Sequence, residues 1–252
     1  MKNRGFFILL TKVVVGIVII LYIFFLYLDF YKKKIFISSE YIKYVCILLC
    51  FLLSVIATKD LLADTDKDIA NHRDILLLQL AMFITVLADL CLIFFGFFIL
   101  GVALFSLVQI TYCARYTTKK LKATLLNFFI VFLCVVLICV LASLFIEGIN
   151  ILITVSLFYV ITLLNSIIKA VGAFKNNLYS SPSKYMIVLG MMLFLLCDIC
   201  VALLAITALF PSYFMSRFQQ ITFFSIWFFY IPSQLLLSLS GGNKILETKS
   251  FK

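Results

Sequence analysis

Hydrophobic residues fill this chain in eight long, nearly continuous runs that short polar segments separate. The runs lie at 6–28, 41–57, 75–95, 97–113, 123–145, 149–168, 185–209 and 222–240. Each run is close to the length, about 20 residues, that an α-helix needs to cross the hydrocarbon core of a bilayer. The apolar positions are continuous rather than alternating, which favours helices over the strands of a membrane β-barrel. The pattern therefore predicts eight transmembrane helices.

The composition agrees with a membrane protein and excludes a water-soluble one. Of the 252 residues, 65% are hydrophobic and 13% are charged, whereas a soluble domain is about half apolar and about a quarter charged. Eight spanning helices and their short loops use nearly the whole length. The sequence thus predicts an all-α, polytopic membrane helix bundle in which residues 1–252 form a single integral membrane domain.

Two short connections predict which helices are neighbours, and one lysine lies inside a predicted span. Gly96 and the Glu147-Gly148 pair leave room only for tight turns, so the third and fourth predicted helices, and the fifth and sixth, should be antiparallel neighbours. The second run is the shortest, and Lys43 lies within it. We expect the Lys43 side chain to extend along the helix until its amine reaches the membrane surface.

The positive charges indicate an orientation. With both termini in the cytoplasm, 15 Lys and Arg residues lie on that side and five on the other, as the positive-inside rule favours. The Lys32-Lys33-Lys34 loop is the exception. The net charge of +10 does not indicate a nucleic-acid partner, because no soluble basic surface would carry one. Abundant Lys, Ile, Phe and Asn suggest a bacterial plasma membrane.

Two features that resemble metal or redox sites have simpler interpretations. The eight cysteines lie in or beside apolar runs and are expected to pack as small hydrophobic residues; they are Cys46, Cys50, Cys91, Cys113, Cys134, Cys139, Cys197 and Cys200. The segment 58–74 is rich in aspartate and carries the only histidine; its acidic residues are Asp60, Asp64, Asp66, Asp68 and Asp74. It lacks the glycine and terminal glutamate of a calcium-binding loop. We expect a solvated acidic loop and no metal site.

Asp89 and Asp198 are the acidic residues that lie deep inside predicted spans. Burying a carboxylate in a bilayer costs at least about 2.5 kcal/mol, and such residues usually face a bundle interior or a cavity. Counted from the span ends near Ile75 and Tyr185, both lie about 20 Å into the membrane. We therefore expect the two carboxylates to lie at one depth and to face each other.

Two carboxylates that meet in a low-dielectric site do not both stay ionised. Desolvation and mutual repulsion raise at least one pKa, so that one proton is held between them. This arrangement supplies an acid beside a base near neutral pH, which acid-catalysed hydrolysis requires. A structural or proton-relay pair with no bond chemistry is the alternative.

Further polar residues recur at helical spacing around these aspartates. The candidates for substrate binding are Gln109, Tyr112, Tyr159, Tyr230 and Gln234. An amide such as Gln109 or Gln234 can hydrogen-bond an aspartate or a substrate hydroxyl. The alternative is that these stripes join neighbouring helices, as polar side chains commonly do in membranes.

Several of these segments resemble a known family. They are Phe83 through Ala88-Asp89-Leu90, the stretch from Leu104 to Tyr112, Leu189-Gly190, Cys197-Asp198, Leu203-Leu204-Ala205, and Tyr230 with Gln234. In these segments the chain resembles the YhhN-like lysoplasmalogenase family. The resemblance covers residues 40–240 and leaves 1–30 as an extra N-terminal helix. Gln109 stands where a histidine is common in the family.

The resemblance implies a function. Family members with a known activity hydrolyse the vinyl-ether bond of lysoplasmalogens and release a fatty aldehyde and a glycerophospho-alcohol. Asp89 and Asp198 match the family's expected catalytic pair. The implied partner is a lysophospholipid or other single-chain lipid that enters from the bilayer, and no metal or organic cofactor is needed.

Other functions stay open at the level of the sequence. Mid-membrane aspartates also suit a proton-coupled transporter, and a non-enzymatic lipid-binding protein would have the same composition. An intramembrane aspartyl protease fits less well, because the chain lacks a glycine just before either aspartate and a Pro-Ala-Leu element.

Overall fold

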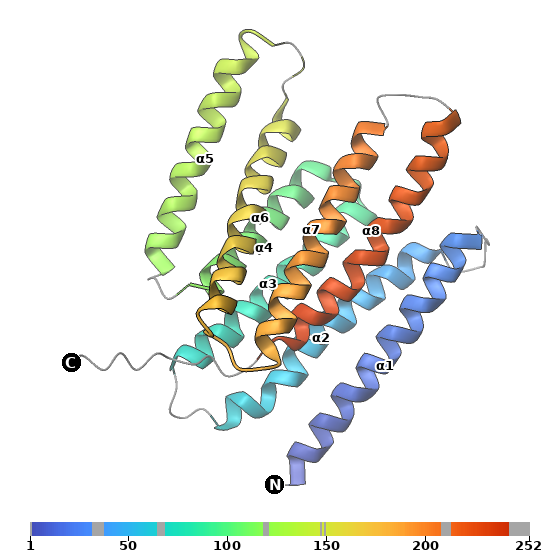
Figure 1. The fold of residues 1–252 in the computed structure, drawn as a ribbon, viewed down its shortest axis with the longest axis vertical. Helices are drawn as coiled ribbons and strands as arrows, with labels where there is room; N and C mark the ends of the chain where they lie inside the picture. The colour runs from blue at the N-terminus through green and yellow to red at the C-terminus, as the bar shows by residue number, and fades with distance from the viewer. Residues whose placement is uncertain are drawn as a thin grey trace. The chain divides into compact units, whose positions relative to one another are not determined.

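The computed structural model describes residues 2–31, 38–64, 69–117, 121–146, 148, 150–207 and 213–241. Within these ranges the chain forms eight helices (Figure 1): α1 (Lys2–Tyr31), α2 (Ser39–Asp64), α3 (Ile69–Ile93), α4 (Phe98–Arg115), α5 (Leu121–Ser143), α6 (Ile151–Lys175), α7 (Ser183–Thr207) and α8 (Tyr213–Leu239). All eight are long and apolar enough to cross a membrane. The predicted fold class and helix number are confirmed.

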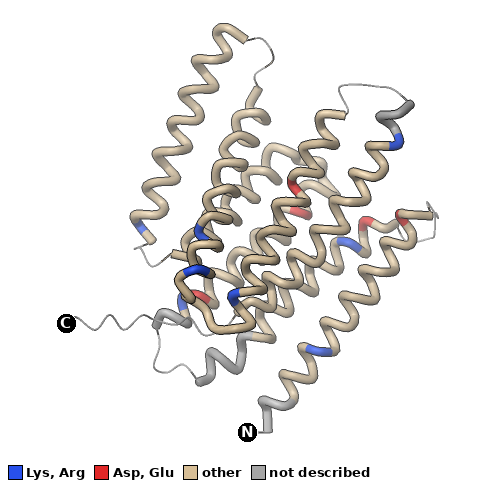
Figure 2. Tube along the Cα trace, viewed as in Figure 1, with Lys and Arg blue, Asp and Glu red and all other residues tan. Residues whose placement is uncertain are grey.

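Some helices extend beyond the apolar runs that predicted them. The run 41–57 becomes α2, which continues to Asp64, and α8 starts at Tyr213, well before the run at 222. An apolar run marks only the part of a helix that lies in hydrocarbon, and backbone hydrogen bonding continues past the membrane surface. Figure 2 accordingly shows long stretches of helix without a charged residue.

The helices form two compact units. Among the described residues, unit 1 contains α1, α2, α7 and α8, and unit 2 contains α3, α4, α5 and α6. Along the chain, α1 and α2 of unit 1 come first, the four helices of unit 2 follow, and α7 and α8 complete unit 1.

In unit 1, α7 packs closely against α8 because Gly190 has no side chain. A Cβ atom at Gly190 would lie 2.8 Å from Leu237 Cγ, so only glycine allows this approach. The Ser233 hydroxyl donates a hydrogen bond of 2.8 Å to the Gly190 carbonyl. One turn along, the rings of Phe194 and Tyr230 meet edge to face at 5.8 Å. These contacts fix the antiparallel register of α7 and α8.

Lys43 of α2 is buried in unit 1, so the prediction that its side chain extends to the surface is wrong. Its Nζ lies 2.7 Å from Asp29 Oδ2 of α1, and the Lys43 side chain is only 1% exposed. The amine also lies over three aromatic rings, at 4.9 Å from the Trp227 centroid, 5.0 Å from Phe223 and 5.7 Å from Phe25. An ion pair and cation–π contacts thus replace water around the amine.

Replacing Lys43 with Met should lower the free energy of unfolding by about 2 kcal/mol, because it leaves the Asp29 carboxylate without its cation. The measurement is thermal or denaturant unfolding in detergent. Lys122→Met is the matched control, since Lys122 is exposed at the start of α5. A Lys43→Met variant as stable as that control would contradict the pairing.

In unit 2, α3 and α4 form the predicted antiparallel pair around a tight turn. Gly96 has a φ of +63°, in the left-handed region that glycine adopts without strain. The side chain of Leu92 occupies the space beside Gly101, and the Tyr112 hydroxyl donates to the Met82 sulfur at 3.5 Å. The register is therefore defined along both helices.

The helices α5 and α6 complete unit 2. They pack against each other, as predicted, and both also contact α4. Gly148 turns the chain with a φ of +97°, and the Asn150 side chain caps α6 by accepting a hydrogen bond of 3.1 Å from the Ile153 amide. Glu147 lies outside the described residues.

The cysteines only partly follow their prediction. All eight are free thiols. Five are buried as expected, but Cys91 and Cys200 are half-buried and Cys134 is exposed. An exposed cysteine in the middle of an apolar helix faces the lipid rather than the protein core.

Candidate functional site

The predicted site residues divide between the two units, and each unit carries one aspartate. Unit 2 holds Asp89 with Gln109, Tyr112 and Tyr159, and unit 1 holds Asp198 with Tyr230 and Gln234. The expectation that the two carboxylates face each other concerns residues of two different units, and it stays a prediction.

Asp89 is buried in unit 2, near the end of α3, with 4% of its surface exposed. The contacts of Met82 with Tyr112 and of Leu92 with Gly101 set the register of α3 and α4. This register places Asp89 level with Phe105. Thr85, one turn before Asp89, lies level with Gln109, so Gln109 is one helical turn from the level of the carboxylate.

Gln109 joins α4 to α6. The Ser166 hydroxyl donates a hydrogen bond of 2.6 Å to Gln109 Oε1, and both residues are fully buried. The Gln109 Nε2 has no hydrogen-bond partner among the described residues. Leaving a buried donor unpaired costs about 1–3 kcal/mol, so this amide is suited to donate to a ligand that enters beside Asp89.

The two predicted tyrosines of unit 2 lie at different levels. The ring centroids of Tyr159 and Phe105 are 6.3 Å apart, which brings half-buried Tyr159 to the level of Asp89. The Tyr112 hydroxyl instead meets Met82, two turns from Asp89, and its ring stacks on Tyr116 with centroids 5.8 Å apart. Within unit 2 the structure thus brings Tyr159 and Gln109, but not the Tyr112 hydroxyl, close to the level of Asp89.

In unit 1, Asp198 is half-buried on α7, one turn beyond Phe194. Tyr230 contacts Phe194 and packs edge to face on Trp227, whose ring centroid is 5.6 Å away. Gln234 follows one turn further along α8. It is fully buried, and neither its Nε2 nor its Oε1 has a hydrogen-bond partner among the described residues. Both glutamines named by the sequence therefore carry buried polar atoms that a ligand could satisfy.

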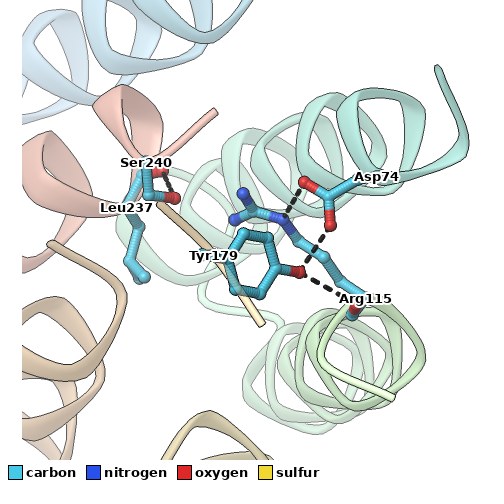
Figure 3. A network of polar contacts seen from close by, with 5 residues as sticks. All are labelled: Asp74, Arg115, Tyr179, Leu237 and Ser240. Carbon is cyan, nitrogen blue, oxygen red and sulfur yellow. Dashed lines mark hydrogen bonds and ion pairs between the residues drawn. The ribbon is translucent and has the colours of Figure 1, made fainter. Parts of the chain in front are cut away.

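A buried ion pair that the sequence did not predict lies at the other end of unit 2 (Figure 3). Arg115 Nε of α4 lies 3.1 Å from Asp74 Oδ2 of α3, and the two side chains are 0% and 1% exposed. The Tyr179 hydroxyl lies 2.5 Å from Asp74 Oδ1 and 3.0 Å from the Arg115 carbonyl oxygen. The prediction that Asp74 belongs to a solvated acidic loop is wrong, because Arg115 and Tyr179 enclose it.

The turn that follows α6 places Tyr179 beside this ion pair. Asn177 adopts a left-handed φ of 47°, as asparagine does at helix ends, and the Leu178 amide bonds back to the Ala173 carbonyl at 2.9 Å. Burial, and next the charge of Asp74, raise the pKa of Tyr179 well above 10. The hydroxyl therefore stays protonated and donates a hydrogen bond to Asp74.

Replacing Tyr179 with Phe should lower the free energy of unfolding by about 1–3 kcal/mol, because Asp74 loses a buried donor. The raised pKa means that this stabilisation is present below pH 10 and is lost only as pH rises through the higher folded-state pKa. Unfolding measured from neutral to alkaline pH tests both points. An unchanged stability, or a difference that vanishes near neutral pH, would be evidence against this role.

These features define the class: a polytopic α-helical membrane protein with one buried or half-buried intramembrane aspartate in each of two helical units. The family model of the YhhN family matches residues 41–241, most of the chain. The protein therefore belongs to the YhhN family, as its sequence resemblance indicated. No curated protein and no solved structure matches the chain.

The family match begins after α1, so α1 is an element added to the family region. Its contacts in unit 1 are specific. Asp29 pairs with Lys43, and the Tyr22 hydroxyl donates a hydrogen bond of 2.9 Å to the Phe228 carbonyl. The added helix thus binds to residues of the family region through polar contacts as well as apolar packing.

Proposed function

We propose that this protein is a membrane hydrolase that cleaves the vinyl-ether bond of lysoplasmalogen-type lysolipids, with Asp89 and Asp198 as an acid/base pair. Membership of the YhhN family supports this activity, because the sequence resemblance to that family implies it. The observation that carries the proposal is the near-complete burial of Asp89 in a membrane-spanning helix. Burying a carboxylate in a membrane costs free energy, so an aspartate at such a position indicates a functional role.

The proposed reaction consumes one water and needs only a proton donor and a base. A neutral aspartic acid donates its proton to the β-carbon of the vinyl ether, which gives an oxocarbenium ion. The ionised partner stabilises this cation and accepts a proton from the water that attacks it. The resulting hemiacetal collapses to a fatty aldehyde and a glycerophospho-alcohol, and the aspartates return to their starting protonation states.

Neighbouring residues would position the lipid. Among the described residues, Gln109 Nε2 and both polar atoms of the Gln234 amide have no partner, so they can hydrogen-bond the glycerol hydroxyl and ether oxygens. Tyr159 and Tyr230 offer ring surface to the chain near the scissile bond. The acyl tail can reach the site laterally from the bilayer.

The direct test is aldehyde release by the purified full-length protein in lipid nanodiscs supplied with a lysoplasmalogen. A lysophospholipid with an ester in place of the vinyl ether is the matched control substrate. Aldehyde from the vinyl ether and no cleavage of the ester support the proposal. Lipid retained without conversion would indicate a lipid-binding protein, and uptake driven by a pH gradient without lipid turnover would indicate a transporter; either result contradicts it.

We also propose that both termini lie in the cytoplasm and that the protein resides in a bacterial plasma membrane. The distribution of Lys and Arg over the loops supports the orientation. Protease digestion of a terminal epitope tag in sealed vesicles of each orientation tests it.

A further inference from the structure

Unit 2 contains a second polar site, whose lining does not include Asp89. It is a partly open cavity of about 220 Å³ between α4, α5 and α6. Its polar lining comes from three parts of the chain: Thr117 after α4, Thr124 and Asn127 on α5, and Asn165 and Lys169 on α6. None of these residues belongs to the proposed hydrolytic site.

The polar lining suits a phosphate group. Lys169 supplies a positive charge, and two amides and two hydroxyls supply neutral hydrogen-bond donors. Asn165 Nδ2 donates one of its two hydrogens to the Ile161 carbonyl at 3.4 Å, which leaves one for a ligand. Among the described residues, no carboxylate lines the cavity and none forms an ion pair with Lys169. A phosphate diester would bring the negative charge that the site lacks.

The remaining lining is apolar. Cys113, Phe128 and Val131 also line the cavity, and they belong to a cluster formed with Ile110, Val135, Cys139 and Phe158 of the same three helices. A site with a cationic, hydroxylated side and an apolar side fits an amphiphile better than a free ion.

The cavity also lies at the right depth for a lipid headgroup. It runs from the end of unit 2, where α4 ends at Arg115, α5 begins at Leu121 and α6 ends at Lys175, inward to Val131 and Asn165, each about 15 Å from its helix end. Lys169 is less than two turns from that end of α6, within reach of the membrane surface for a flexible lysine. We expect the phosphates of the adjacent leaflet near the ends of these spans.

The cavity begins away from Asp89, but its inner end reaches the same level, because Val131 precedes Phe132, whose ring meets that of Phe158 beside Tyr159. In the α3–α4 register Cys113 lies level with Ala81, two turns and about 12 Å from Asp89. Its lining includes residues of α5, which packs against α4 and α6. Lys169, three residues after Ser166, lies near the level of Tyr112, so a phosphate beside it lies nearer the end of unit 2 than Asp89 does.

We propose that this cavity binds the phosphate of a membrane phospholipid, with Lys169 as its cation, Asn127 and Asn165 as hydrogen-bond donors, and Phe128 and Val131 against the glycerol and the start of the acyl chains. The bound lipid would hold the ends of α4, α5 and α6 together at the membrane surface. The proposal concerns binding and does not depend on the hydrolase activity.

The test measures binding of fluorescent phosphatidylglycerol to the full-length protein in detergent, together with the lipids retained in native mass spectra. Lys169→Met should weaken binding about tenfold, because a charge-assisted bond is lost, and Lys169→Arg should retain most of it. Lys175→Met is the matched control, on the same helix and outside the cavity, and should change binding less than about twofold. Lys169 is exposed, so its replacement should not unfold the protein.

Three results would overturn the proposal. Equal binding by wild type and Lys169→Met, or equal losses for Lys169→Met and Lys175→Met, would show that the cavity does not hold the phosphate. Inorganic phosphate distinguishes the source of the anion. If millimolar phosphate displaces the lipid and stabilises wild type but not Lys169→Met, the site holds a free anion and not a phospholipid; failure of phosphate to displace the lipid supports the proposal.

Discussion

Asp89→Asn and Asp198→Asn should each lower the rate of aldehyde release from a lysoplasmalogen by at least about 100-fold, the usual range for loss of a general acid or base. An amide has nearly the shape of the carboxyl group but can neither deliver a proton to the vinyl ether nor accept one from water. In the proposed mechanism the pair shares one proton, so loss of either member removes both functions. The measurement is aldehyde production by equal amounts of purified wild type and variants.

The matched control is Glu40→Gln, another acid-to-amide change, at an exposed position in the first turn of α2. It should keep wild-type activity. Elution as a single species in size-exclusion chromatography and an unchanged unfolding temperature show that an inactive variant is still folded. Wild-type rates in both aspartate variants would reject the assignment of the site.

Arg115→Leu should lower the free energy of unfolding by about 3–5 kcal/mol, the cost of breaking a buried ion pair by removing one partner. Arg115 and Asp74 are 0% and 1% exposed, so water cannot solvate the carboxylate that is left. Burial raises the pKa of Tyr179, the charge of Asp74 raises it further, and the charge of Arg115 lowers it. Unfolding in detergent, followed by circular dichroism against denaturant, measures the loss.

A double variant separates the ion pair from simple loss of packing. Asp74→Leu with Arg115→Leu removes both charges and should be more stable than Arg115→Leu alone, because no unpaired charge stays buried. Lys122→Met, at an exposed position, should be neutral. A loss below about 1 kcal/mol for Arg115→Leu would indicate that the pair is solvated.

The helices could be predicted because bilayer thickness sets the length of each apolar run. The turn at Gly96 could be predicted as well, since the polar segment between the third and fourth runs is too short for anything longer. The ends of α2 and α8 could not, because polar residues continue a helix beyond the hydrocarbon without an apolar signal.

The buried charges could not be predicted, because their partners are distant in the sequence. Arg115 and Asp74 are 41 residues apart, and Tyr179 is 105 residues from Asp74. A charge near the end of an apolar run is usually solvated, so the sequence does not distinguish the buried Arg115 and Lys43 from lysines and arginines that reach the membrane surface. The one available signal was the aromatic pair Tyr112 and Tyr116 beside Arg115, which is typical of an enclosed guanidinium.

The candidate site was predicted in part. An aspartate inside an apolar run can be recognised in the sequence alone. The helical spacing of polar residues likewise places Gln109 on the polar face of its helix. The hydrogen bond between Gln109 and Ser166 joins residues 57 positions apart, and spacing along one helix contains no information about such a link. Helical spacing also grouped Tyr112 with Gln109, although the Tyr112 hydroxyl is directed to Met82.

The central claim is that Asp89 and Asp198 act as one acid/base unit, and a double-variant comparison of turnover tests it most directly. Rates of aldehyde release are measured for wild type, Asp89→Asn, Asp198→Asn and the variant that carries both changes. Residues that work as a unit are not additive, so the account predicts that the double variant is no slower than the slower single one. Losses that multiply would contradict it, because each aspartate would then act alone.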